Sequence, residues 1–323
     1  MNSEIELDSV IESINRAGKI GIFTHVSPDG DAIGSILALY LGLKQLKKEV
    51  DVIADECSKC FSFLPCINDI KSTTKEKYDL AIAIDCASKP RLFDKEGSFD
   101  KSSLTISIDH HSSNTYFATI NYVEDKSPAA CKTLIKILKR LGVSINYDIG
   151  TCLMAGIITD SGGFRYKNVD DETFEFAAHM LDVGVDISDI YYRTFDVKTK
   201  AQFELSRIAM DRLKFYNKNK IALTYITLKD IKKAKAEIGD HEGIVNVGRN
   251  IEGVDVSVFL REDIDGTYKV SLRSNDNVNV SDVAEVFGGG GHDRAAGCSL
   301  DCSLEEAIKS IVKEINRHLW MVF

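Results

Sequence analysis

Short apolar segments recur through the first half of this chain, and each ends in an acidic residue or a histidine. They lead, in order, into His25 with Asp29 and Asp31, into Asp85, and into the triplet Asp109, His110 and His111. Between them lie stretches whose apolar residues recur every three or four positions, as in amphipathic helices. Strands alternating with helices predict an α/β fold, a largely parallel sheet with helices on both faces.

The expected elements of this first region follow from the same patterns. Strands are expected at 19–26, 50–54, 80–85, 104–108 and 118–123, and helices at 32–48, 128–141, 149–158 and 171–183, after an amphipathic opening helix. Asp160 is expected in a glycine-rich turn between two of these helices. Ligands of such sheets bind beyond the carboxyl ends of the strands, so the polar residues are predicted to converge on one crevice.

A second, smaller region follows a change in composition. A mixed-charge helix is expected at 198–215, then a polar turn at 216–220, strands at 221–227, 254–261 and 268–273, and helices at 228–238, 280–287 and 304–318. With 323 residues and 44% hydrophobic content, two cores are feasible. The predicted organisation is a catalytic domain 1–190, a linker helix region 191–216 and a substrate-binding domain 217–323, with the active site in the interdomain cleft.

Charge and cysteine usage narrow the classes of function. A formal net charge of −9 disfavours broad wrapping of duplex nucleic acid. The acidic N-terminus and the lack of an apolar run of roughly 20 residues indicate neither secretion nor membrane insertion. Eight scattered cysteines indicate reduced thiols in the cytoplasm. Cys57, Cys60 and Cys66 could hold zinc or form a redox pair, but no fourth ligand follows, which favours an ordinary structural role.

The clustered carboxylates and imidazoles are ligands suited to manganese, iron or zinc. His25 and Asp29 can share one ion, while Asp31, His110 and Asp160 can hold a second, with Asp85 as the bridge. His111 can donate a proton or hydrogen bond to a leaving oxygen, and Asp109 can orient a histidine. Each piece alone fits a helix cap, a turn or surface packing, whereas their joint placement at strand ends favours a metal site.

Candidate phosphate contacts lie outside this set. Arg165 follows Asp160 closely, and Arg273 with Ser274 ends a strand of the second region. The run that includes Gly289, Gly290 and Gly291 offers an unhindered backbone for anions, and His292 follows it. Surface charge and a flexible hinge are the alternative interpretations of these arginines and glycines.

Together these motifs resemble the DHH phosphoesterase family. The match comprises His25 with Asp29 and Asp31, then Asp85, the Asp109–His111 triplet and Asp160, while the segment 288–297 is similar to the DHH-associated domain of the first subfamily. The resemblance spans nearly the whole chain and is strongest to bacterial nanoRNA oligoribonucleases that also dephosphorylate phosphoadenosine phosphate. The Asp293–Arg294 pair departs from the family pattern inside a segment expected to bind a terminal phosphate.

The resemblance implies two divalent cations, manganese above all. One would bind His25, Asp29 and Asp85, and the other Asp31, Asp85, His110 and Asp160. It implies that Arg273 and His292 contact the far end of short single-stranded RNA, of dinucleotides such as pApA, or of 3'-phosphoadenosine 5'-phosphate. The alternatives are a cyclic-dinucleotide phosphodiesterase, an inorganic pyrophosphatase of the second family, a single-strand-specific DNA exonuclease and a nucleotide sensor without catalysis. A homodimer is also possible.

Overall fold

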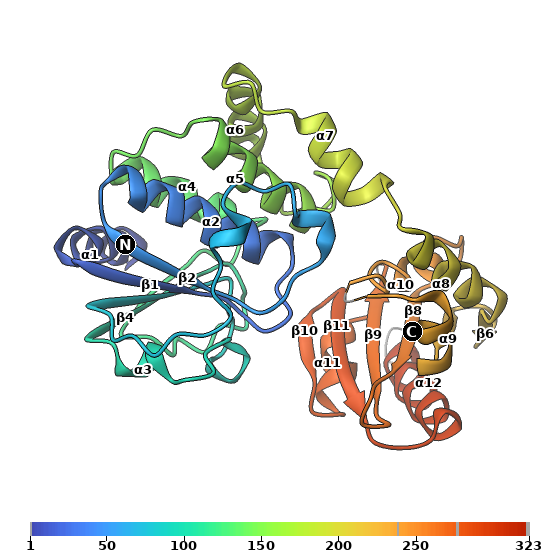
Figure 1. Cartoon of the computed structure of the whole chain (residues 1–323). Helices are drawn as coiled ribbons and strands as arrows, with labels where there is room; N and C mark the ends of the chain where they lie inside the picture. Colours follow the sequence, from blue (N-terminus) through green and yellow to red (C-terminus); the bar gives the residue numbers. More distant parts are fainter. Residues whose placement is uncertain (1, 238, 276–277, 321–323) are drawn as a thin grey trace. The chain divides into compact units, whose positions relative to one another are not determined.

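The computed structural model describes residues 2–237, 239–275 and 278–320, and the chain divides into two compact units, Met1–Val197 and Lys198–Phe323 (Figure 1). The first unit holds a five-stranded sheet in the order β2-β1-β3-β4-β5. Its strands are β1 (Lys19–Phe23), β2 (Glu49–Ile53), β3 (Leu80–Ile84), β4 (Leu104–Asp109) and β5 (Ile120–Val123). Every neighbouring pair is parallel. The predicted parallel α/β fold is therefore confirmed.

Long helices cover one face of this sheet. They are α1 (Asn2–Arg16), α2 (Gly30–Gln45), α4 (Ala130–Arg140) and α5 (Tyr147–Asp160), with α6 (Asp171–Asp182) and α7 (Ile187–Tyr191) farther along the chain. Ile20 and Ile22 of β1 belong to the core on this side, whereas Phe23 belongs to a separate core on the other. That other face is covered by the short α3 (Ser98–Lys101), the turn η3 (Lys89–Arg91) and loop segments, and not by long helices as on the first face.

The helices α2 and α5 approach each other closely because small residues line their contact. A Cβ on Gly30 would clash with the Thr159 side chain, and one on Gly34 would clash with the Cys152 carbonyl. A Cβ on Gly156 would lie 2.7 Å from Asp31 Oδ1. Glycine at these positions lets the start of α2 and the end of α5 meet, which brings Asp31 and Asp160 to the same place.

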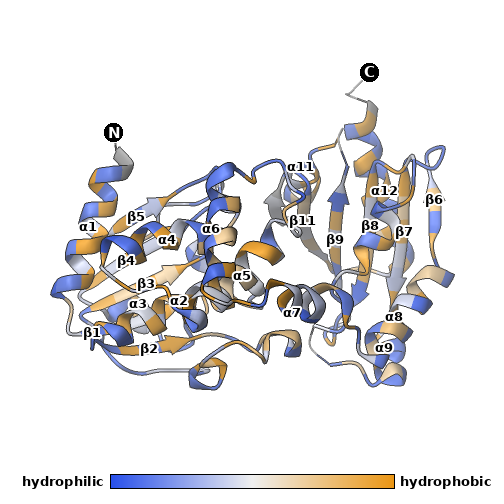
Figure 2. Ribbon diagram, turned by 90° about the horizontal axis from the view of Figure 1, so that it is seen from above, coloured by the Kyte–Doolittle hydropathy of each residue, from blue (hydrophilic) through white to orange (hydrophobic). Residues whose placement is uncertain are grey.

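The second unit contains a six-stranded sheet in the order β10-β11-β9-β8-β7-β6. The strands are β6 (Lys214–Tyr216), β7 (Ile221–Ile226), β8 (Val256–Glu262), β9 (Tyr268–Ser274), β10 (Gly290–His292) and β11 (Ala295–Leu300). Only β7 and β8 are parallel, and the other neighbours are antiparallel. The helices are α8 (Lys200–Asp211), α9 (Leu228–Ala234), α10 (Val245–Arg249), α11 (Val280–Glu285) and α12 (Leu304–Trp320). β3 is apolar throughout, whereas β9 alternates apolar and polar residues (Figure 2).

Two local predictions were wrong, and two strands were not foreseen. The helix expected to reach residue 215 ends at Asp211. β6 follows and pairs with β7 across a turn in which Asn217, Lys218 and Asn219 have positive φ. No strands were expected at 290–292 or 295–300, where β10 and β11 pair. Asp160 is the last residue of α5, not part of the turn that follows. Within the described residues, no helix has both the length and the apolar character needed to cross a membrane.

Candidate metal centre

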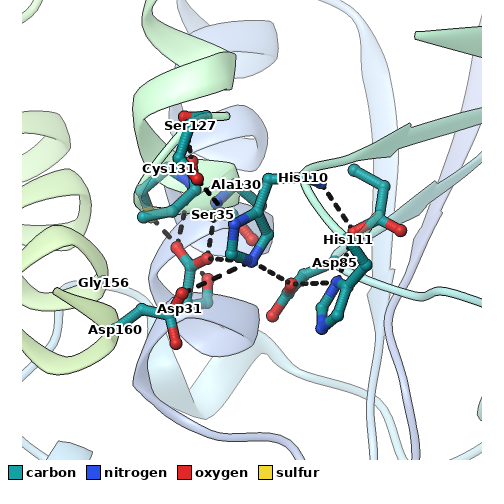
Figure 3. Close-up of polar contacts among 12 residues, drawn as sticks. Asp31, Ser35, Asp85, His110, His111, Ser127, Ala130, Cys131, Gly156 and Asp160 are labelled. Carbon is teal, nitrogen blue, oxygen red and sulfur yellow. Dashed lines mark hydrogen bonds and ion pairs between the residues drawn. The ribbon is translucent and has the colours of Figure 1, made fainter. Parts of the chain in front are cut away.

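The candidate site lies beyond the carboxyl ends of β1, β3 and β4. β2 pairs with one side of β1, and the chain then crosses over to form β3 on the other side. The gap between β1 and β3 is therefore the topological switch point of the sheet. His25 follows β1, Asp85 follows β3, and His110 follows β4. Ligands bind at such switch points in open parallel sheets. Figure 3 shows the side chain of His110 between Asp31 and Asp160 on one side and Asp85 on the other.

Asp85 lies at the middle of the cluster and is 2% exposed. Its φ is +56°, an uncommon backbone conformation for a residue other than glycine and one often retained at functional sites. Its Oδ1 is buried without a hydrogen bond, and it lies 3.5 Å from His110 Nε2 and 3.6 Å from His111 Nδ1. Its Oδ2 lies 3.7 Å from His25 Nε2. A buried carboxylate oxygen without a hydrogen-bond donor is costly, and a bound cation would compensate for the missing donor.

Backbone carbonyls orient two of the histidines. His25 Nδ1 lies 2.9 Å from the Val26 carbonyl oxygen, and His110 Nδ1 lies 3.0 Å from the Ser127 carbonyl oxygen. A carbonyl oxygen can only accept, so each Nδ1 carries the hydrogen and donates it. In the neutral ring, Nε2 then offers its lone pair toward the carboxylates, the arrangement typical of metal-binding histidines.

Two of the aspartates also serve helix N-termini. Asp29 Oδ1 accepts from the backbone N–H groups of Asp31 and Ala32, so Asp29 caps α2. Asp31 is buried and accepts from Ala130 N at 2.5 Å and Cys131 N at 2.9 Å, at the start of α4. The N-cap residue of α4 is Ala129, which has no capping side chain. Asp29 and Asp31 therefore cap helices, the simpler interpretation of this motif, and they also lie at the cluster.

Three groups of side chains place ligand atoms within 4.8 Å of one another. They are His25, Asp29 and Asp85; then Asp31, His110 and Asp160; and then Asp85, His110 and His111. The first two correspond to the two ion sites predicted from the sequence, except that Asp85 was expected in both. Among the described residues, none of these groups includes a cysteine. The sharing of Asp85 and His110 between groups makes the cluster one continuous donor set.

Asp109 lies behind this set and is fully buried. Its Oδ1 accepts from His110 N at 2.8 Å and lies 2.7 Å from His111 Nδ1, and its Oδ2 accepts from Asn114 Nδ2 at 2.6 Å. Asp109 therefore lies within hydrogen-bond distance of the His111 ring, the contact that its expected orienting role would use. Asn114 was not identified from the sequence, where its one signal was its place three residues after His111.

Electrostatics of the cluster fit a cation. Burial and the nearby Asp85 charge raise the pKa of Asp31 to about 7, and burial raises the pKa of Asp160 well above its usual value. Burial opposes charge on Asp85 as well, but His110 and His25 hold its pKa well below the usual range. Burial lowers the pKa of His25, yet Asp85 more than offsets this and raises it to about 9. Protons and imidazoles thus balance the negative charge of these carboxylates, and bound divalent ions can take over that role.

The other candidate residues lie in different places. Arg165 is exposed in the turn after α5, and its Nε donates to the Gly162 carbonyl at 2.5 Å. In the second unit, Arg273 and Ser274 end β9, and Ser274 is buried with its hydroxyl 3.4 Å from the Asp293 carbonyl. The side chain of His292 lies outside the described part of the structure.

The three candidate glycines differ in whether a side chain would fit at their positions. A Cβ on Gly289 would collide with the backbone at Gly297, and one on Gly291 with the Ala295 carbonyl. Gly291 also has a φ of +151°. A Cβ on Gly290 would meet nothing within 4 Å. Packing and backbone geometry account for Gly289 and Gly291, whereas Gly290 faces open space.

Comparison with known proteins places these features in a family. The model described as "DHH family, N-terminal domain" matches residues 19–157, and the DHHA1 domain matches residues 219–321. The chain is also 32% identical over 307 residues to a protein of Thermus thermophilus named bifunctional oligoribonuclease and PAP phosphatase NrnA, covering 93% of this chain and 91% of that one. The chain belongs to the DHH family. The resemblance inferred from the sequence motifs is therefore confirmed.

Solved structures of DHH-family relatives share this fold. A crystal structure of an exopolyphosphatase-related protein from Bacteroides fragilis matches with a TM-score of 0.90 and 28% identity, over 99% of this chain and 98% of that one. RecJ from Thermus thermophilus in complex with Mn²⁺ matches with a TM-score of 0.55 and 13% identity, over 97% of this chain and 54% of that one. The first likeness extends through both domains of the DHH-family chain.

Proposed function

We propose that this DHH-family chain is a metal-dependent phosphoesterase that hydrolyses short oligoribonucleotides. Its substrates would be nanoRNA and linear dinucleotides such as pApA, cleaved to mononucleotides, and 3'-phosphoadenosine 5'-phosphate, which would lose one phosphate. The observation that carries the proposal is the continuous donor set in which Asp85 and His110 each belong to two groups of ligand atoms. The name of the Thermus relative supports the substrate class.

The same donor set supports a centre for two divalent ions. His25, Asp29 and Asp85 would hold one ion, and Asp31, Asp85, His110 and Asp160 the other. The unbonded Oδ1 of Asp85 supports its role as the bridge. Mixed carboxylate and imidazole donors suit manganese, the ion named for the RecJ structure. When bound, such ions neutralise phosphate charge and lower the pKa of water.

The remaining residues of the site would orient groups and move a proton. His111 is one-fifth exposed at its side chain and lies beside Asp85, so it can donate to the oxygen of the leaving group. Asp109 would keep its ring in place through Nδ1. Arg165, Arg273, Ser274, His292 and the backbone at Gly289, Gly290 and Gly291 would bind the substrate away from the reacting phosphate.

One panel of substrates tests the proposal. Purified protein with manganese is incubated with end-labelled RNA of two to twenty-four nucleotides, phosphoadenosine phosphate, pApA, cyclic di-AMP and pyrophosphate. We expect cleavage of the shortest RNAs, pApA and phosphoadenosine phosphate, and loss of cleavage in Asp85→Asn. Wild-type activity in that variant would remove Asp85 from the centre. Preference for cyclic di-AMP or pyrophosphate would favour the corresponding alternative enzyme, and tight nucleotide binding without product would favour a sensor.

We also propose a cytoplasmic location, which the buried thiols Cys86, Cys131 and Cys152 support because oxidising compartments favour disulfides. The expected homodimer is tested by sedimentation of the purified chain. The domain limits at residues 190 and 216 are tested by limited proteolysis, which should cut first in the linker region.

A further inference from the structure

Asn114 joins two strand ends at the candidate metal centre. It lies in the loop after β4 and is 7% exposed. Its Nδ2 donates to Asp109 Oδ2 at 2.6 Å and to the Cys86 carbonyl at 3.4 Å. Cys86 directly follows Asp85, so this one amide contacts the segments that carry the central carboxylate and the Asp109–His111 triplet. Its own backbone N–H donates to the His111 carbonyl at 3.1 Å.

The Asn114 amide supplies a hydrogen bond that the buried carboxylate of Asp109 needs. Asp109 is fully buried, and a buried carboxylate is costly unless its oxygens accept hydrogen bonds. One oxygen serves the His110 backbone and the His111 ring, and the other receives the Asn114 amide. Without that donor, Asp109 would be free to rotate toward another partner, and the ring of His111 would lose its anchor.

We propose that Asn114 is a positioning residue that sets the affinity of the centre for a divalent cation. By fixing Asp109, which accepts from the backbone N–H of the proposed ligand His110, and by contacting the Cys86 carbonyl next to Asp85, it holds the two segments that carry these ligands together. The proposal rests on the metal centre described under the proposed function. Partners that orient metal ligands typically change metal affinity or activity by about 10- to 100-fold when they are removed.

Asn114 has a second, purely structural contact that the test must separate. Its Oδ1 accepts from Tyr116 N at 2.7 Å, and Tyr116 adopts a φ of +52°. The two tasks use different atoms, because Nδ2 contacts Asp109 and Oδ1 contacts Tyr116. Asn114→Asp keeps the shape and the acceptor for Tyr116, but it places a carboxylate oxygen against Asp109. A role confined to the loop predicts no loss in Asn114→Asp, whereas the positioning role predicts a large one.

The experiment measures manganese affinity by electron paramagnetic resonance of free Mn²⁺ in the full chain. The variants are Asn114→Asp, Asn114→Ala and the control Asn121→Asp. Asn121 makes a comparable local contact, with Oδ1 3.2 Å from Ala118 N and Nδ2 2.8 Å from the Ala118 carbonyl, but it contacts no residue of the centre among those described. Circular dichroism establishes that each variant is folded.

We expect the manganese dissociation constant to rise about tenfold or more in both Asn114 variants and to stay at the wild-type value in Asn121→Asp. The kcat for pApA should fall with it, while KM changes less. Wild-type affinity in a folded Asn114→Asp would overturn the role of Asn114 alone, and if that variant does not fold, wild-type affinity in Asn114→Ala would do the same. A wild-type chain that binds no manganese would instead overturn the proposed centre.

Discussion

Alanine at Gly156 is expected to damage the candidate metal centre although alanine suits the helix that carries it. Gly156 lies inside α5, where replacing glycine with alanine ordinarily stabilises a helix by about 1 kcal/mol. Here the new Cβ would lie 2.7 Å from Asp31 Oδ1 and closer still to Cys131 Sγ. The carboxylate would have to move by about 0.7 Å to reach an ordinary contact of 3.4 Å.

The balance of these effects gives the magnitude. Overpacking a close helix contact costs about 1–3 kcal/mol, which exceeds the helix-propensity gain, so we expect net destabilisation of about 1 kcal/mol. The larger effect should fall on function. Asp31 is held by the first N–H groups of α4 and cannot shift without losing them. A misplacement approaching 1 Å can cost about 100-fold in rate.

The assay compares Gly156→Ala with the control Gly42→Ala. A Cβ on Gly42 would lie 2.7 Å from Leu138 Cδ2 and 3.3 Å from Val143 Cγ1, two core side chains that do not belong to the donor set, so this variant overpacks α2 away from the site. Manganese titration should show weakened metal binding in Gly156→Ala and wild-type binding in Gly42→Ala, while urea unfolding measures the cost of overpacking in each. A Gly156→Ala protein that is more stable than wild type and binds manganese equally well would refute the reasoning.

Three further predictions concern metal removal, pH and the glycine segment. Chelation with EDTA should abolish hydrolysis and lower the melting temperature in calorimetry, with both restored by manganese, because a bound ion stabilises only the folded state. Burial raises the pKa of Asp230, but Arg212 and Thr227 lower it to about 2, so Asp230→Asn should cost up to about 2 kcal/mol near neutral pH. In urea unfolding, the difference in unfolding free energy between wild type and Asp230→Asn should be present above about pH 4, the pKa of Asp in the unfolded chain, and should vanish as pH falls toward 2. A difference that stays constant with pH would contradict this. Gly290→Ala should leave stability unchanged and raise KM for pApA, since its Cβ meets only open space; an unchanged KM would place the substrate elsewhere.

Sequence patterns predicted the first unit well because its signals are local. Buried parallel strands give continuous apolar runs, and a residue that ends such a run must lie at the edge of the sheet. Asp85 was assigned to the candidate site because it ends one such run while His25 and the Asp109–His111 triplet follow others. The second unit was harder, because β6 and β10 have three residues each and their strand character comes from neighbouring strands.

The sequence by itself determined the fold class, the family and the set of candidate ligands, since these depend on which residues follow which apolar runs. Only the tertiary structure decided how those ligands divide their work. Asp31 caps α4, about 100 residues along the chain, while facing the cluster, and the second oxygen of Asp109 depends on Asn114. Such roles are set by hydrogen bonds between segments far apart in the chain or by loop geometry. No periodicity encodes them, because each depends on where a particular atom lies after packing.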